Sequence, residues 1–176
     1  MIWKALYFFL PAYIANAAPS FFRRINFLNK PVDCGHKFRG KRIFGDNKTF
    51  KGLLVAIVFG TLMFALQKLL FSKGIFLKIS LINYSSYSII LGFLLSTGTI
   101  LGDLFESFFK RQRGILSGKP WVPFDQTDYV IGALLFSSIL FIPNIWTIIF
   151  LLLSSLIIHP VSHYLGFLLK INKDEF

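Results

Sequence analysis

The segment GDLFESFFKRQRG, residues 102–114, ends a long apolar stretch and carries charges of both signs. Asp103 and Glu106 lie inside an apolar run of membrane length, 87–109, and Lys110 follows it directly. On a helix these three positions are spaced i, i+3 and i+7, so their side chains share one face. Charged side chains at membrane depth line a cavity, pair with one another or bind an ion. The segment therefore predicts a polar site at the end of a membrane helix.

A simpler interpretation of this face is an internal ion pair between Glu106 and Lys110 near the helix end. That pair leaves Asp103, one turn deeper, without a partner. The ion pair alone therefore does not account for the whole charged face.

The composition of the whole chain is that of a membrane protein. Of its 176 residues, 55% are hydrophobic and 15% are charged, which is too few charges to cover a soluble domain of this length. A helix that spans a bilayer needs about 20 mostly apolar residues. We therefore expect one all-α integral membrane domain over residues 1–176. About five spans are expected: 2–22, 52–71, 87–109 and two within 129–169, divided by a turn at 142–144. The stretch 73–86 is too short to cross and is expected at the membrane surface.

Basic residues are distributed unevenly along such a bundle. Of the 19 Lys and Arg residues, fifteen lie in the loops 23–51 and 110–124 or in the C-terminal tail. The other four are Lys4, Lys68, Lys73 and Lys78. Cytoplasmic loops carry the excess of Lys and Arg, so we expect a multi-pass protein with both loops and the C-terminus in the cytosol and the N-terminus outside. This distribution also explains the net charge of +11 without nucleic-acid binding.

The first span contains residues that interrupt an apolar helix. Pro11 and Asn16 break the continuous apolar core that a signal peptide needs, so the span is expected to be retained. Asn16 is also a polar side chain at membrane depth. A hydrogen bond to another helix is the alternative to a role in a binding site.

Six of the eight acidic residues lie in or beside the two basic loops, while Asp174 and Glu175 lie in the tail. The six are Asp33, Asp46, Asp103, Glu106, Asp125 and Asp128. Because both loops are expected on one side, the sequence predicts that these carboxylates converge on one face of the membrane.

The segment PFDQTD, 123–128, places two of these carboxylates at the start of an apolar helix. Asp125 is suited to be the helix N-cap, and Asp128 then resembles the partner in a capping box. Capping and metal binding can coexist. With Asp103 and Glu106, these side chains could hold a hard cation such as Mg²⁺ through oxygen ligands.

The segment GDNKTFKG, 45–52, lacks the spacing of a nucleotide-binding P-loop, which excludes that class of NTPase. Lys48 and Thr49 nevertheless stand at the start of a helix, where free backbone N–H groups and a cation can bind a phosphate. An N-cap formed by Asp46 or Asn47 is the alternative interpretation.

Taken together, these segments resemble a known family. GDLFESFFKR resembles the C-terminal signature of the CTP-dependent phosphatidate cytidylyltransferases, in which Ser, two residues and Lys-Arg (107–111) precede an apolar residue and Pro (122–123). The Lys-Asp, His-Gly-Gly and Asp-Arg elements of the bacterial and eukaryotic enzymes are absent. In their place stands DQTD (125–128), which, with NKTFKG (47–52) and YIANAAP (13–19), resembles the archaeal branch, the CDP-archaeol synthases.

The resemblance covers essentially the whole chain and implies transfer of CMP from CTP to a lipid phosphate, with release of pyrophosphate. The lipid would be a geranylgeranyl diether glycerol phosphate within the membrane, and the cofactor Mg²⁺. The active site would face the cytosol. The expected metal ligands are Asp103, Glu106, Asp125 and Asp128, and the expected catalytic residues are Asp103, Asp128 and Lys110. Lys48, Lys110 and Arg111 would bind phosphates, and Asn16 and Thr49 would line the pocket.

A different class of protein, a small ion-coupled transporter, could use Asp103 and Glu106 as a relay. Such a transporter is expected to carry charges at several depths of the bilayer, whereas here they cluster beside basic loops. Two other lipid enzymes are excluded by their motifs. The D-x-x-D-G-x-x-A-R pattern of the CDP-alcohol phosphotransferases is absent, and only one of the two Asp-rich motifs of membrane prenyltransferases is present.

Overall fold

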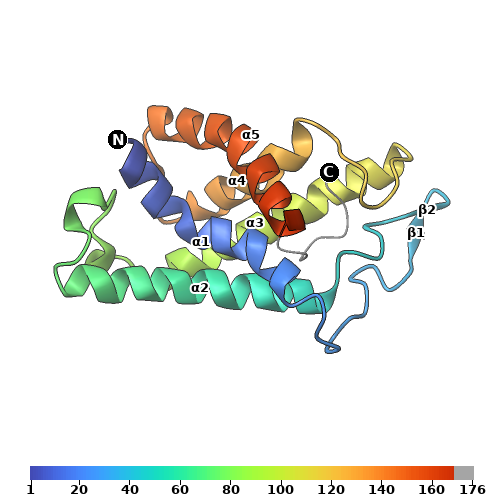
Figure 1. The fold of residues 1–176 in the computed structure, drawn as a ribbon, viewed down its shortest axis with the longest axis horizontal. Coiled ribbons are helices and arrows are strands. Elements are labelled where there is room, and N and C mark those ends of the chain that lie inside the picture. Colours follow the sequence, from blue (N-terminus) through green and yellow to red (C-terminus); the bar gives the residue numbers. More distant parts are fainter. Residues whose placement is uncertain (169–176) are drawn as a thin grey trace.

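The computed structural model describes residues 1–168, and the C-terminal tail that we expect in the cytosol lies outside them. The described part contains five α-helices (Figure 1): α1 Ile2–Phe21, α2 Phe50–Ser72, α3 Ile90–Gln112, α4 Phe124–Ser137 and α5 Ile145–Leu168. Strands β1 (Lys37–Phe38) and β2 (Lys41–Arg42) form an antiparallel hairpin between α1 and α2, and the 3-10 turns η1 (Leu77–Ile79) and η2 (Tyr84–Ser86) connect α2 to α3. The number of helices agrees with the number of predicted spans.

Within the described residues, α2, α3 and α5 are long and apolar enough to cross a membrane. At 1.5 Å per residue, each is about 35 Å long, compared with a hydrocarbon core of about 30 Å. Helix α4 has 14 residues and is shorter than that core. The link between α4 and α5, 138–144, includes the predicted residues 142–144, but its turn lies at 138–140.

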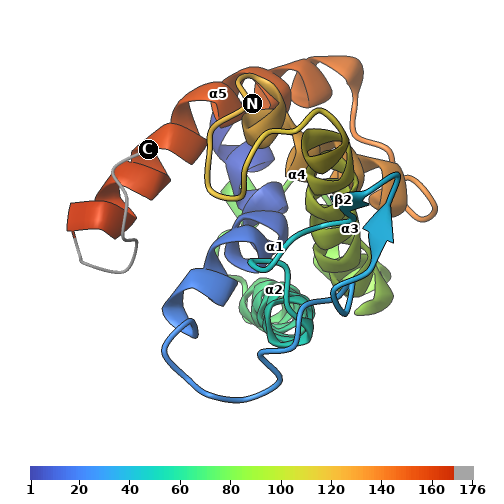
Figure 2. The same ribbon diagram turned by 90° about the vertical axis from the view of Figure 1, so that its right-hand side faces the viewer.

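Helices α1, α2 and α3 run lengthwise through the molecule and cross one another at an angle (Figure 1). The hairpin, the end of α3 and the start of α4 lie at one end of the bundle, which we call the hairpin end, and the N-terminus and the α2–α3 connection lie at the other (Figure 1). Both basic loops are therefore at the same end, as the sequence predicts. Viewed from the hairpin end, α5 inclines away from the other helices toward its C-terminus (Figure 2).

Small residues on α1 and α2 let the helices of the core approach closely. Ala5, Ala12 and Ala15 of α1 are completely buried, and a Cβ added to Gly60 of α2 would meet the carbonyl oxygen of Pro11 at 2.7 Å. Larger side chains fill the space on either side of these contacts. The completely buried aromatic side chains are Phe8, Phe9, Phe64 and Tyr84, and Tyr129 is nearly so.

Glycines also bring α3 and α4 together, the most extensively packed pair of helices in the described part. A Cβ on Gly132 of α4 would overlap the carbonyl oxygen of Gly98, and one on Gly102 of α3 would overlap that of Asp128. Small residues four positions apart are typical of closely packed membrane helices. This crossing places Asp128 beside the helical turn that carries Asp103.

The loop before α2 is organised by a buried carboxylate. Asp33 accepts hydrogen bonds from the backbone N–H groups of Gly35, Phe44 and Gly45 and from the Arg42 guanidinium, at 2.7–3.2 Å. Burial acts to raise the pKa of Asp33, but these hydrogen bonds, led by that of Arg42, outweigh it and hold the pKa below its ordinary value. Arg42 also pairs with Asp46. Two of the six carboxylates expected to converge with the others therefore hold this loop in place instead.

Candidate active site

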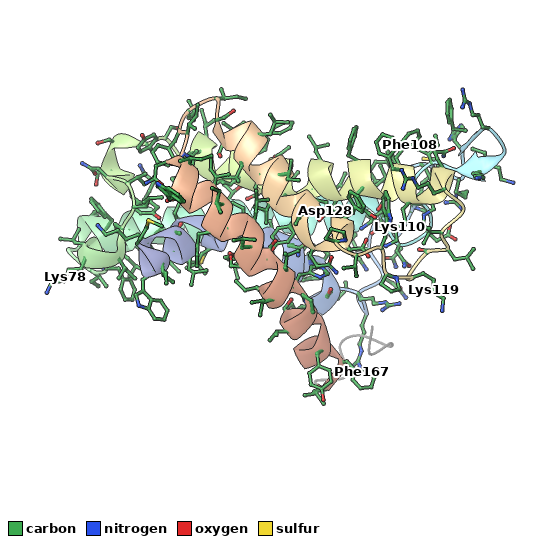
Figure 3. All side chains as sticks on the ribbon, turned by 90° about the horizontal axis from the view of Figure 1, so that it is seen from above. Lys78, Phe108, Lys110, Lys119, Asp128 and Phe167 are labelled. Atoms are coloured by element: carbon green, nitrogen blue, oxygen red, sulfur yellow. The ribbon has the colours of Figure 1, made fainter. Side chains whose placement is uncertain are left out.

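A cavity of about 610 Å³ opens at the hairpin end of the bundle. Its walls come from the loop before α2, the last turns of α3, the loop 113–123, the start of α4 and one stretch of α5. Asp128 and Lys110 lie close together there, with Lys119 nearby, whereas Lys78 lies at the opposite end (Figure 3). The cavity collects most of the residues predicted for the site: Lys48, Asp103, Glu106, Lys110, Arg111, Asp125 and Asp128.

Lys48 and Asp103 form the first ion pair of the cavity. The Lys48 ammonium lies 2.6 Å from each carboxylate oxygen of Asp103, although 55 positions separate the two residues. Thr49 fixes the chain at this point, because its hydroxyl accepts a hydrogen bond from the N–H of Gly52 and so caps α2. The alternative interpretation, a cap by Asp46 or Asn47, is therefore wrong.

The environment of Lys48 favours its charged form. Burial alone would lower the pKa of this amine, but Asp103, followed by Asp128 and Glu106, outweighs burial and raises it. Lys48 thus stays protonated at neutral pH and can bind an anion.

Lys110 forms the second ion pair. Its ammonium lies 2.6 Å from Asp125 and 3.8 Å from Glu106, so the Glu106 pair suggested by the sequence is present but is the longer of the two. The other oxygen of Asp125 accepts a hydrogen bond from the backbone N–H of Trp121 at 2.6 Å. Asp125 therefore links Lys110 to the loop 113–123.

The capping role expected of Asp125 and Asp128 is wrong in its details. Helix α4 begins at Phe124, its N-cap position is Pro123, and no side chain caps it. Asp125 lies in the first turn and bonds to the preceding loop instead. One oxygen of Asp128 accepts a hydrogen bond from the N–H of the next residue.

The carboxylates fit a hard cation by their chemistry. Asp103, Glu106 and Asp128 offer only oxygen atoms, which Mg²⁺ prefers. Oε1 of Glu106 is buried and has no hydrogen-bond partner among the described residues, and its ion pair with Lys110 is long, at 3.8 Å. No three acidic, His or Cys side chains of residues 1–168 converge into a preformed metal site, and Asp103 and Asp125 are each paired with a lysine. A metal would therefore have to compete with, or displace, these pairs.

Two predicted pocket residues lie elsewhere. Asn16 is half-buried within α1, and Thr49 caps α2; neither is among the residues that line the cavity. Their roles in the pocket remain predictions. Conversely, Gln126 and His159 are not among the predicted site residues, yet both line the cavity. Gln126 is buried and its side-chain oxygen has no hydrogen-bond partner among the described residues, which makes it available to a ligand.

Comparison with known proteins identifies the family. The family model for CarS-like CDP-archaeol synthase matches residues 1–176. The chain belongs to the CDP-archaeol synthase family. It is 35% identical to the CDP-archaeol synthase of Methanocaldococcus jannaschii, over 97% of this chain and 95% of that protein. It is also 35% identical to that of Pyrococcus abyssi, over 96% and 95% of the two chains.

A solved structure agrees with this assignment. An intramembrane enzyme for archaeal membrane lipids biosynthesis superposes with a TM-score of 0.71 at 29% identity, over 92% of this chain and 94% of that one. The resemblance to the archaeal cytidylyltransferases is thus confirmed. The chain is a membrane-embedded cytidylyltransferase of lipid biosynthesis, like the other CDP-archaeol synthases, and the alternative of an ion-coupled transporter is not supported.

Proposed function

We propose that the cavity transfers CMP from CTP to an unsaturated geranylgeranyl diether glycerol phosphate, with release of pyrophosphate. One observation carries the proposal. The cavity unites cations suited to a triphosphate with carboxylates suited to a metal, at the end of a bundle of membrane helices. A lipid phosphate anchored in the bilayer and a water-soluble nucleotide can both reach such a position.

The reaction needs alignment and charge neutralisation rather than a strong base. A phosphomonoester has a second pKa near 6, so at neutral pH the lipid phosphate is already a dianionic nucleophile for the most part. One of its oxygens forms a bond to the α-phosphorus of CTP. The bond from that phosphorus to the oxygen that bridges it to the β-phosphate breaks, and pyrophosphate leaves with the electron pair.

The cations would hold the triphosphate in line for this displacement. Lys48 and Lys110 are each paired with a carboxylate at 2.6 Å, so we infer that phosphate oxygens replace Asp103 and Asp125 as their partners when CTP binds. Arg111, on the same wall, offers a planar donor group suited to two phosphate oxygens. These contacts stabilise the charge that builds up on the leaving pyrophosphate.

Asp103 and Asp128, with Glu106, would hold Mg²⁺ beside the triphosphate. Asp125 is the weakest candidate of the four predicted ligands, because both of its oxygens are already used by Lys110 and Trp121. Bound Mg²⁺ would neutralise phosphate charge and polarise the phosphoryl oxygens.

The proposed reaction is tested by a transfer assay. Purified protein is incubated with Mg²⁺ and CTP labelled in the α-phosphate, with either the geranylgeranyl diether phosphate or a diacyl glycerol phosphate as acceptor. We expect label in the organic phase with the diether lipid, and no label when ATP labelled in its α-phosphate replaces the labelled CTP. Absence of label with every lipid phosphate would refute the proposed reaction.

We also propose that the hairpin end faces the cytosol, as the distribution of basic residues predicts. The test uses Lys41→Cys in a Cys34→Ser background, which removes the one natural cysteine. A membrane-impermeant thiol reagent should label this position in inverted vesicles and spare it in intact cells. Labelling in intact cells would reverse the orientation.

A further inference from the structure

The hairpin end carries an exposed surface that the cavity does not use. We call it the hairpin patch, and it consists of Lys37, Phe38, Arg39, Phe105, Phe108 and Phe109. Lys37, in strand β1 opposite Arg42, and Arg39, in the turn, are both exposed, and we call these two basic residues the tip. The Arg39 guanidinium lies 5.4 Å from the centre of the Phe38 ring. Phe38 in turn lies 5.8 Å from Phe108 of α3, ring centre to ring centre. The patch therefore joins basic residues of the hairpin to aromatic residues of a membrane helix.

The hairpin is built to be rigid. Arg39 and Gly40 both have positive φ angles, 51° and 79°, which suits the two-residue turn of a tight hairpin. At its base, Arg42 is bound by Asp33 and Asp46, each at 2.7 Å. The ammonium of Lys41 donates a 2.6 Å hydrogen bond to the carbonyl of Gln112 at the end of α3. The tip is thus fixed relative to α3.

The geometry of α3 sets the depth of the patch in a membrane. From Ile90 to Phe109 the helix rises by about 29 Å at 1.5 Å per residue, which matches a hydrocarbon core of about 30 Å. Phe105 and Phe109 are 68% and 42% exposed at its last turns. Aromatic rings are enriched at the boundary between hydrocarbon and water. Phe38, packed on the neighbouring Phe108, then lies at this boundary, and the basic tip lies at the depth of the headgroups.

The charge of the tip is not neutralised by the protein. Both carboxylates of the surrounding loop, Asp33 and Asp46, are bound to Arg42, and no ion pair of Lys37 or Arg39 occurs in the described part of the chain. Basic residues at the membrane surface are attracted by anionic headgroups, and a guanidinium can bind a phosphate through two parallel hydrogen bonds. This charge complements a bilayer surface that carries anionic lipids.

We propose that the hairpin patch binds the anionic headgroups of the membrane leaflet at the hairpin end, with Phe38 at the boundary and Lys37 and Arg39 on lipid phosphates. This contact is separate from catalysis. It would set the depth and tilt of the hairpin end in the bilayer.

The experiment measures the environment of the hairpin directly. The full-length protein with Cys34→Ser and Phe38→Cys is labelled with a polarity-sensitive fluorophore and reconstituted into vesicles of phosphatidylcholine with or without phosphatidylglycerol. Quenching by lipids brominated near the headgroup reports contact with the bilayer. We expect a blue-shifted and at least twofold more strongly quenched emission in the anionic vesicles. The difference should disappear near 1 M salt, where the screening length falls to about 3 Å.

Two double variants distinguish binding by the hairpin patch from a general effect of the net positive charge of the protein. Lys37→Ala with Arg39→Ala should abolish the difference between the vesicles. Lys73→Ala with Lys78→Ala, two exposed lysines at the other end, should leave it unchanged. Equal emission in both kinds of vesicle, or a difference that survives the first double variant, would overturn the proposal. Self-quenching that grows with protein density would also overturn it, because a second copy of the chain would then cover the patch.

Discussion

Replacement of Asp103 and Asp128 by Asn tests the core of the site. Asn is nearly isosteric with Asp but carries no charge, so the shape of the cavity is kept while two candidate metal ligands are weakened. If both carboxylates hold one Mg²⁺, each single change should lower kcat and raise the concentration of Mg²⁺ needed for half-maximal activity.

The two Asp→Asn changes should affect activity and stability to different extents. Loss of one charged contact to a transition state costs about 2.7–4 kcal/mol, which corresponds to a decrease in kcat of about 10²–10³. The effect on stability should be small. The Lys48–Asp103 pair retains about a quarter of its side-chain surface exposed, and partly exposed pairs contribute about 1 kcal/mol or less. Activity should therefore fall far more than the free energy of unfolding.

The KM for CTP distinguishes a metal ligand from a simple ion-pair partner. If Asp103 serves only to hold Lys48, Asp103→Asn leaves a free ammonium that binds phosphate more readily, so KM should fall and kcat should change little. If Asp103 holds the metal, kcat should fall and excess Mg²⁺ should restore part of it. The double variant should be little worse than either single one, because residues that act as a unit are not additive.

The assay is CTP turnover against Mg²⁺ concentration, with Asp46→Asn as the matched control. The Asp46 side chain is 77% exposed and pairs with Arg42 outside the cavity, so its loss should leave turnover unchanged. Wild-type kcat and an unchanged Mg²⁺ requirement in both single variants would refute the shared metal site.

Three further predictions test other parts of the structure. Lys110→Ala should lower CTP turnover at least tenfold, whereas Lys73→Ala, at the far end of the bundle, should not. Equal losses would mean that both lysines act only by orienting the protein in the membrane. Gly102→Ala should separate α3 from α4 and lower both the melting temperature and activity, whereas Gly52→Ala, whose Cβ would meet its nearest neighbour at 3.4 Å, should be tolerated. Asp33→Asn should destabilise the protein by about 3 kcal/mol at neutral pH, as for a broken buried pair. Because the native pKa of Asp33 is lowered, the Asp33 carboxylate stabilises the folded protein above the unfolded pKa of about 3.9, and this stabilisation is lost as the pH falls from that value toward the native pKa. The melting temperatures of the wild type and Asp33→Asn should therefore converge in acid. A difference in melting temperature that does not depend on pH would contradict this role.

The helices and the charged cluster could be predicted because both depend on local patterns. Apolar runs of membrane length give the helices, and charges at i, i+3 and i+7 give one face of α3. The close crossing of α3 and α4 also has a local signal in the sequence, because Gly98 and Gly102 lie four positions apart. That crossing brings Asp103 and Asp128 to the same cavity.

The remaining features depend on contacts between distant segments. The sequence of the loop before α2 is that of a polar linker and does not predict a hairpin. The hairpin depends on the hydrogen bonds that Asp33 accepts from Arg42 and from the backbone. Asp125 has the sequence position of a helix cap, but its two oxygens accept hydrogen bonds from the Lys110 ammonium and the backbone N–H of Trp121 instead. His159 reaches the cavity only because α5 crosses the start of α4, a crossing that no periodicity encodes.

The balance of charges in the cavity implies that CTP and Mg²⁺ bind together. Among the described residues that line it, four side chains are cationic and four are carboxylates: Lys48, Lys110, Arg111 and Lys119, with Asp103, Glu106, Asp125 and Asp128. If a triphosphate bound without a metal, its oxygens would replace the carboxylates as partners of the cations. The carboxylates would then lie unpaired beside the negative charge of the triphosphate, which is unfavourable in a partly buried site.

Mg²⁺ that binds together with the nucleotide removes this repulsion, because it binds the carboxylates that are no longer paired with the lysines. Each ligand should therefore increase the affinity of the other by the same factor, as linkage requires. The dissociation constant of CTP, measured without lipid so that no turnover occurs, should decrease at least tenfold when Mg²⁺ is added. In Asp103→Asn with Asp128→Asn, two negative charges are gone, so CTP should bind better without Mg²⁺ than it does to the wild type, and added Mg²⁺ should have little effect. If instead the wild type binds CTP equally with and without Mg²⁺, the four cations suffice for the nucleotide and the carboxylates serve only to hold them in place.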